Sequence, residues 1–346
     1  MLTTLATFLL SAAAIVTAGV LGVRWLERAL MLGGIGRVGI AGPLRSLAWV
    51  LPELAVVVQA RMINEPILAV GVVLGAAVAN VLAIGLLDLL APAGHETSEL
   101  PVSRRDLVAV TLPLFVGFLT IPALALGSRS PSVGYGRSAV SSISQQVAAA
   151  FSVLAFLLAL RLLDRLPDAD KPVDRPDPLG SPGTAPGSLA RATAFTGLAA
   201  VVVVYGAPTF CAAAAQLLHE GLDVDQVGIG RTLGVTWAVL IGVILAIPDF
   251  LLGRLASPKA TGRVRVDLPR AVATLLVLAG VVDLGARTRE NGLAGVLFGP
   301  LLLTCLGGTT AMLFLLVAWP DAPPRARGAV LSSLALAGLI LAVLAA

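Results

Sequence analysis

Two short motifs place an acidic residue directly after a proline inside apolar stretches of the sequence. Pro52-Glu53 and Pro248-Asp249 each fall somewhat past the middle of such a stretch. A proline removes one backbone donor and disturbs the preceding turn, so a carbonyl oxygen upstream loses its partner. Carbonyl oxygens beside a carboxylate form the all-oxygen ligand set that hard cations such as Ca²⁺ prefer. We therefore predict that Glu53 and Asp249 bind a metal cation or a proton, and that the two prolines shape the site.

The alternative is that the prolines only kink packing helices, and that protons or arginines neutralise the acids. A charged side chain at the centre of a membrane span costs about 2.5–3.5 kcal/mol, so an acid there is usually functional. Two such motifs in corresponding positions favour the functional interpretation. The ion would be the cargo of the site, and no cofactor is expected.

The composition indicates that these acids lie inside a membrane. Of 346 residues, 57% are hydrophobic and 13% are charged, whereas soluble domains carry about a quarter charged residues. Apolar stretches of about 20 residues, each long enough to cross a bilayer as a helix, recur along the chain. The sequence therefore predicts an all-α polytopic membrane protein whose main partner is the lipid bilayer.

The apolar stretches and the polar breaks between them predict ten transmembrane helices in two halves. The first half (1–164) has spans near 4–24, 38–60, 66–90, 106–127 and 146–163, and the second (191–346) near 192–218, 227–253, 268–286, 292–318 and 328–345. Between the halves, residues 165–190 are rich in proline, aspartate and glycine, which predicts a flexible cytoplasmic linker.

Basic residues are distributed unevenly over the loops, which predicts the orientation. Seventeen lie in odd-numbered loops and six in even-numbered ones, so the odd loops are expected in the cytoplasm and both termini outside. Topology thus explains the basic residues better than nucleic-acid binding does. Because nearly all of the basic residues are arginines, the composition suggests a bacterial gene. A multi-pass protein from such a gene is expected in the bacterial inner membrane. Arg24 and Arg28 follow the first span, which favours a retained helix over a cleaved signal peptide.

The two halves also resemble each other. Residues 83–89 (AIGLLDL) are echoed by 278–284 (LAGVVDL) at a separation of 195 residues, and 51–53 (LPE) by 247–249 (IPD) at 196. Because five spans is an odd number, the second half must enter the membrane from the opposite side. This predicts two inverted five-helix repeats, an architecture of secondary transporters in which the site lies near the midplane.

One segment carries a motif that resembles a known family. Residues 48–53 read AWVLPE, and 18 residues after the acid, residues 71–80 read GVVLGAAVAN. This resembles the first α-repeat of the calcium/cation antiporters, which include sodium/calcium exchangers and carry G-T-S-x-P-E followed at this spacing by G-N-x-x-G-S-N-x-x-N. The resemblance implies α-repeats at 38–90 and 227–286, and exchange of Ca²⁺ or Na⁺ against Na⁺ or H⁺. It adds Gly71, Gly75 and Asn80 as secondary site residues.

The chain departs from that pattern where the family has ligand oxygens. The positions of the family's hydroxyl and amide ligands hold side chains without oxygen, namely Trp49, Val50, Val72, Ala76 and Ala77. A transport-silent membrane scaffold or sensor that retains the exchanger fold is therefore the second hypothesis. A carrier of organic solutes would need a larger polar cavity.

Three further charged residues lie near the ends of predicted spans. Arg270 falls roughly where the first repeat has Gly75, and its guanidinium either occupies the place of the cation or lies at the interface with its head in water. Asp88 and Asp283 end the third and eighth spans and are expected at the membrane edge rather than in the site. With no phosphate-binding loop and no Ser/His/Asp set in the sequence, we do not expect an enzyme.

Overall fold

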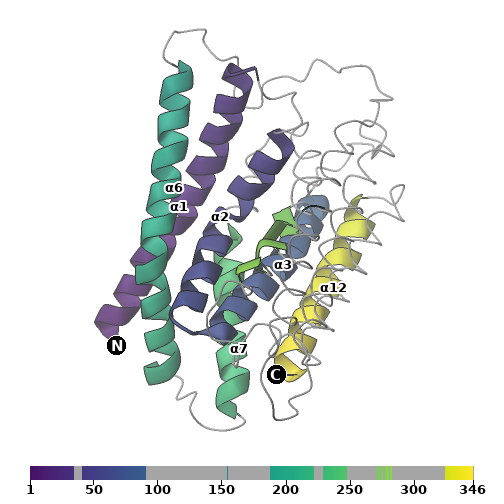
Figure 1. Ribbon diagram of the computed structural model, residues 1–346. Coiled ribbons are helices and arrows are strands. Elements are labelled where there is room, and N and C mark those ends of the chain that lie inside the picture. The colour runs from purple at the N-terminus through teal and green to yellow at the C-terminus, as the bar shows by residue number, and fades with distance from the viewer. Residues whose placement is uncertain are drawn as a thin grey trace, which may run out of the picture.

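The computed structural model describes residues 1–34, 41–90, 154, 188–221, 229–247, 271–272, 274–275, 277–279, 281–282 and 324–345. They form α1 (Leu2–Leu32), α2 (Ala41–Met62), α3 (Pro66–Leu89), α6 (Ser188–Gln216) with the π-helical turn η3 (Leu217–Gly221), α7 (Ile229–Leu245) and α12 (Pro324–Ala345) (Figure 1). The described residues of 271–282 are helical as well, and no strand occurs in this part of the chain. The predicted all-α fold is confirmed to that extent.

The described helices coincide with predicted spans. Three segments are long and apolar enough to cross a membrane, at Leu2–Leu32, Ile67–Leu86 and Leu189–His219. α1 continues beyond its predicted end at residue 24, and α6 begins at Ser188, inside the predicted linker. The predicted spans at 106–127 and 292–318 lie outside the described residues, so the total of ten helices stays a prediction.

Helices α1 and α6 lie side by side and run in opposite directions (Figure 1). Near one end the rings of Phe8 and Phe210 stack at 5.0 Å between centroids, and near the other those of Trp25 and Phe195 stack at 4.8 Å. Since Phe8 precedes Trp25 whereas Phe210 follows Phe195, the pair is antiparallel. Stacked aromatic rings add to the apolar contact along the seam.

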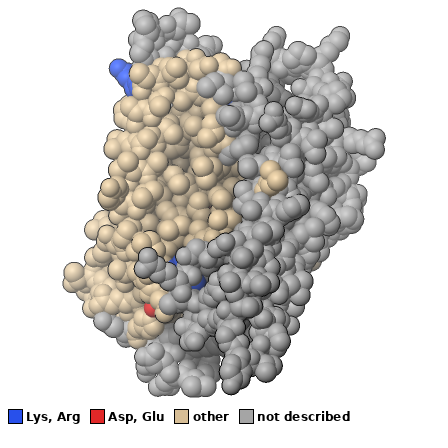
Figure 2. Space-filling view, in the orientation of Figure 1, with Lys and Arg blue, Asp and Glu red and all other residues tan. Residues whose placement is uncertain are grey.

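The outer face of this pair is apolar. Among the described residues, large hydrophobic side chains are exposed along both helices, including Leu9, Leu10, Leu198, Val204 and Tyr205. Figure 2 shows that the coloured part of this face carries few charged side chains, with basic atoms at its upper edge and both basic and acidic atoms in its lower part. Apolar surface of this extent is expected where lipid covers the protein.

Helix α3 lies between α7 and α12, and glycines allow its backbone to approach both. A Cβ atom added at Gly75 would lie 2.9 Å from Gly242 Cα on α7, and one added at Gly71 would meet Ala238. At the other end of α3, a Cβ atom added at Gly85 would lie 2.9 Å from Ser332 N on α12. Such small-residue crossings are how helices pack tightly inside a membrane, where no hydrophobic effect drives them together.

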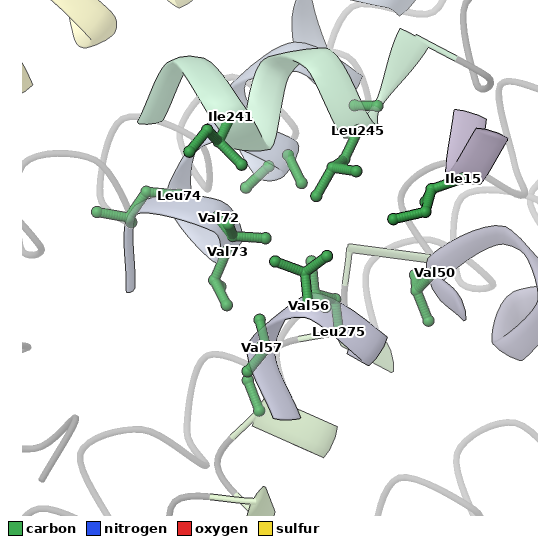
Figure 3. Packing of buried hydrophobic residues seen from close by; sticks show 14 of the residues in the cluster. Ile15, Val50, Val56, Val57, Val72, Val73, Leu74, Ile241, Leu245 and Leu275 are labelled. Atoms are coloured by element: carbon green, nitrogen blue, oxygen red, sulfur yellow. The ribbon is translucent and has the colours of Figure 1, made fainter. Parts of the chain in front are cut away.

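Apolar side chains fill the space between α2, α3 and α7. In Figure 3, Val56, Val72 and Leu245 point into a common centre, one from each helix, and Leu275 from the segment 271–282 lies beside Val56. All four are fully buried. The interior next to the proposed site is therefore a packed apolar core.

A buried ion pair joins α3 to α12. Arg327 Nε donates to Asp88 Oδ2 at 2.7 Å, and the side chains are 5% and 0% exposed. Asp88 stands near the end of its helix, as predicted, and its carboxyl group is buried. The first turn of α12 covers it, because Gly328 lets the backbones of the two helices approach closely.

A second ion pair lies at the short turn between α2 and α3. His219 Nε2 is 2.8 Å from Glu65 Oε1, and the side chains are 44% and 21% exposed. Exposed pairs contribute about 0–1 kcal/mol because water competes for both groups. We expect His219→Ala to lower the free energy of unfolding by less than about 1 kcal/mol. Thermal melting in detergent checks this, and a larger loss would mean that the pair holds η3 in place.

Candidate functional site

Glu53 lies near the middle of α2 and is buried. The 22 residues of α2 span about 33 Å, and Glu53 lies near the middle of that length. Its side chain is 1% exposed, and Oε2 has no hydrogen-bond partner in the part of the chain that is described. Burial makes the charged form of this carboxyl group costly unless a proton or a cation neutralises it.

Pro52 lies inside α2 without ending the helix. Its nitrogen carries no hydrogen, so the carbonyl oxygen of Ala48, one turn earlier, loses its usual partner. This carbonyl oxygen lies about one turn from Glu53. That it and the carboxyl group share an ion stays a prediction.

The turn at residues 63–65 is short, so α2 and α3 form an antiparallel hairpin. Counting the same number of residues back along α2 and forward along α3 from this turn places Gly75 level with Glu53. By the same count Asn80 lies level with Ala48. The Asn80 side chain is buried, and its Oδ1 finds no hydrogen-bond partner among the described residues.

The residues that replace the family's ligands are buried apolar core. Val50, Val72, Ala76 and Ala77 all belong to the main hydrophobic cluster. Their side chains supply packing and no oxygen atoms, so only Glu53 and Asn80 offer side-chain oxygens at the motif positions of the first repeat. Gly71 and Gly75 lie where α3 crosses α7. The close approach of the two backbones explains why these positions hold glycine.

Two polar residues on α2 were missed as site candidates. Ser46 and Trp49 are buried, and neither Ser46 Oγ nor Trp49 Nε1 has a hydrogen-bond partner within the described helices. The sequence carried a signal for them, since they precede Glu53 by seven and four residues and so share its helix face. Trp49 was considered only as a lost ligand.

The second half of the predicted site is not described. Pro248, Asp249 and Arg270 lie outside the described residues, so the meeting of Glu53 with Asp249 stays a prediction. In the described part, no group of three or more His, Cys, Asp or Glu side chains is placed to hold a metal ion.

Comparison with solved structures identifies the fold. YfkE in its native state superposes with a TM-score of 0.58 at 14% identity, covering 97% of this chain and 92% of that one. The sodium-calcium exchanger NCX_Mj soaked with 2.5 mM Na⁺ and 0.1 mM Ca²⁺ gives 0.54 at 16% identity, covering 98% of both chains. This chain has the fold of the calcium/cation antiporters.

The antiporter fold covers nearly the whole chain, whereas the sequence motif covered residues 38–90. NCX_Mj soaked with 100 mM Na⁺ and 10 mM Sr²⁺ also superposes, with a TM-score of 0.54 at 15% identity over 97% of both chains. No protein-family profile and no curated protein matches the sequence. NCX_Mj is an exchanger and not an enzyme, in agreement with the prediction.

Proposed function

We propose that this protein is a secondary active transporter that exchanges cations across the membrane. Glu53 and Asp249 together bind the transported ion at a site near the bilayer midplane. Ca²⁺ or Na⁺ is exchanged there against Na⁺ or H⁺. The observation that carries the proposal is the buried Glu53 carboxyl group, whose Oε2 has no partner among the described residues. Such a group requires a neutralising ion, and a site that alternately takes up and releases one is the core of an antiporter.

The proposal includes ten helices in two inverted five-helix repeats. The antiparallel pairing of α1 with α6, the first helices of the two halves, supports it. Packing also supports a fixed group of helices and a separate moving pair. The glycine crossings and the Asp88–Arg327 pair fasten α3 to α7 and α12, while α1 and α6 pack mainly on each other. In the proposed cycle the α1–α6 pair rocks past the core.

The oxygen count limits what the site can hold. Ca²⁺ takes six to eight oxygen ligands, whereas the first repeat supplies the Glu53 carboxyl group, the Asn80 amide and the Ala48 carbonyl. Even with Asp249 added, one ion at a time or protons alone fit this set. Several simultaneous ions do not.

Ion flux in proteoliposomes tests the proposal. Glu53→Gln keeps the shape of the side chain but cannot carry a charge or exchange a proton, so flux should fall to the level of liposomes without protein. Glu65→Gln is the matched control, because Glu65 is partly exposed at the end of α2, and it should retain flux. Undiminished flux in Glu53→Gln, with folding verified by size-exclusion chromatography, would exclude Glu53 as the transport site.

A transport-silent scaffold or sensor is the second candidate, and the apolar residues at the ligand positions favour it. Melting in detergent across concentrations of Ca²⁺, Na⁺ and H⁺ separates the two functions. A ligand that binds only the folded state raises the melting temperature with its concentration. A dependence on one cation that disappears in Glu53→Gln supports transport, and the absence of any response supports the scaffold.

A further inference from the structure

Glu53 is the last of three buried polar side chains along one face of α2. Ser46, Trp49 and Glu53 are spaced by three and four residues, so their side chains lie one above another. Each has a buried polar atom without a hydrogen-bond partner in the described part of the chain, namely Ser46 Oγ, Trp49 Nε1 and Glu53 Oε2. Asn80 Oδ1 on α3 shares this property and lies level with Ala48, one residue before Trp49. We call these four residues the polar lane.

The hydroxyl groups of α1 and α6 behave differently from Ser46, whereas that of Ser332 on α12 also has no hydrogen-bond partner in the described part of the chain. Thr7, Ser11, Thr193 and Thr196 each donate to the carbonyl oxygen four residues earlier in their own helix, at 2.7–3.0 Å. This back-bonding is the usual way for a helix to satisfy a hydroxyl group. Ser46 is fully buried and does not do so, which indicates that its hydroxyl serves a partner beside the helix.

Four unsatisfied polar groups in succession indicate a small polar ligand. Buried polar atoms in proteins are nearly always hydrogen-bonded, to protein or to ordered water. The lane offers both roles, because the indole N–H only donates, the hydroxyl does both, and the two side-chain oxygens accept. Pro52 leaves the carbonyl oxygen of Ala48 without its usual helical donor, at the level of Asn80. Water, with two donors and two acceptors, matches this mixture, whereas a bare cation is repelled by the indole N–H.

The lane has a direction. Ser46 stands seven residues before Glu53, about 10 Å closer to the N-terminal end of α2. On the other side of Glu53 the same face continues as the buried apolar residues Val56, Val57 and Ala60. On this face of α2, the described polar groups adjoin Glu53 on its N-terminal side, and apolar groups adjoin it on the C-terminal side as far as Ala60, which the buried Arg61 follows.

We propose that the polar lane holds a file of water molecules that connects Glu53 with the solution at the N-terminal end of α2. This inference rests on the proposed function and extends it, since it names the route by which a proton or a hydrated cation reaches the carboxyl group. The basic-residue count predicts that this end faces the cytoplasm.

Cysteine labelling in the full-length protein tests the lane. Ser46→Cys and Val57→Cys are reconstituted separately in liposomes, treated with a small charged methanethiosulfonate reagent, and the adducts located by mass spectrometry. Because the thiolate is the reactive form and needs water, we expect Ser46→Cys to react at least about tenfold faster than Val57→Cys. Cys211, buried with its sulfur 3.5 Å from the Val56 carbonyl oxygen, is present in both variants and should stay unmodified.

Asn80→Cys probes the same lane from α3 and should also react faster than Val57→Cys. It keeps the test decisive should Ser46→Cys fail to fold. Equal rates for the lane positions and Val57→Cys would overturn the proposal. Rapid labelling combined with unchanged flux in Glu53→Gln would preserve the lane and reject antiport through Glu53. If the lane positions are not labelled but flux is abolished in Glu53→Gln, the lane is rejected and antiport through Glu53 is supported.

Discussion

Replacing Gly75 with alanine is expected to prevent the native packing of α3 against α7. The added Cβ would meet the carbonyl oxygen of Val239 and lie 2.9 Å from the Cα of Gly242. Both neighbours are backbone, so the contact is relieved only if the two helices separate. Overpacking of ordinary side chains costs about 1–3 kcal/mol, and separation of a backbone crossing should reach or exceed that range. Size-exclusion chromatography and thermal melting of the purified variant measure the loss.

Gly197→Ala on α6 is the matched control for Gly75→Ala. No atom lies within 4 Å of a Cβ added there, and alanine is favoured over glycine inside a helix by about 1 kcal/mol. The control should therefore melt at or above the temperature of the unchanged protein. If Gly75→Ala melts at the same temperature as Gly197→Ala, α3 and α7 do not cross in backbone contact.

Removal of Asp88 is expected to have the second large effect. Asp88→Ala leaves the Arg327 guanidinium buried without the carboxylate it donates to at 2.7 Å. Breaking a buried pair by removing one partner costs about 3–5 kcal/mol, because the remaining charge stays out of water. We expect a large fall in melting temperature and a reduced yield of folded protein in detergent.

The double variant Asp88→Leu, Arg327→Met distinguishes loss of the pair from loss of packing. Apolar side chains of similar size remove both charges, and such replacements are often neutral or stabilising. Most of the stability lost in Asp88→Ala should return. Arg325→Ala is the control for the arginine, since Arg325 is exposed in the same turn and should tolerate replacement. A double variant as unstable as Asp88→Ala would show that the ion pair itself is required.

Residues of the candidate site could be predicted from the sequence where the evidence for them lies in neighbouring residues or in a motif of fixed spacing. Glu53 and Pro52 are adjacent residues in one apolar stretch, so their burial follows from the span that contains them. Asn80 was found through a fixed spacing in a motif. Ser46 and Trp49 were not, because a serine or a tryptophan in a membrane helix usually finds a partner, and only the packed structure shows that these two do not.

The buried pair of Asp88 with Arg327 is a second feature that the sequence could not predict. The sequence placed both residues correctly at the ends of their spans. It contained no indication that they face each other, since 239 positions separate them. Whether a terminal acid meets water or an arginine depends on which helix covers it.

The sequence by itself determined that the chain crosses a membrane as helices, approximately where α1, α2, α3, α6, α7 and α12 begin and end, and that an acid lies in the middle of α2. These properties follow from hydropathy and from backbone hydrogen bonding, which act over neighbouring residues. Only the tertiary structure decided that α3 touches α7 through bare backbone, that Asp88 is covered, and that Ser46 and Trp49 are buried on the same helix as Glu53 with side-chain atoms that lack a partner among the described residues. Those properties depend on contacts between distant segments, which hydropathy along the chain does not encode.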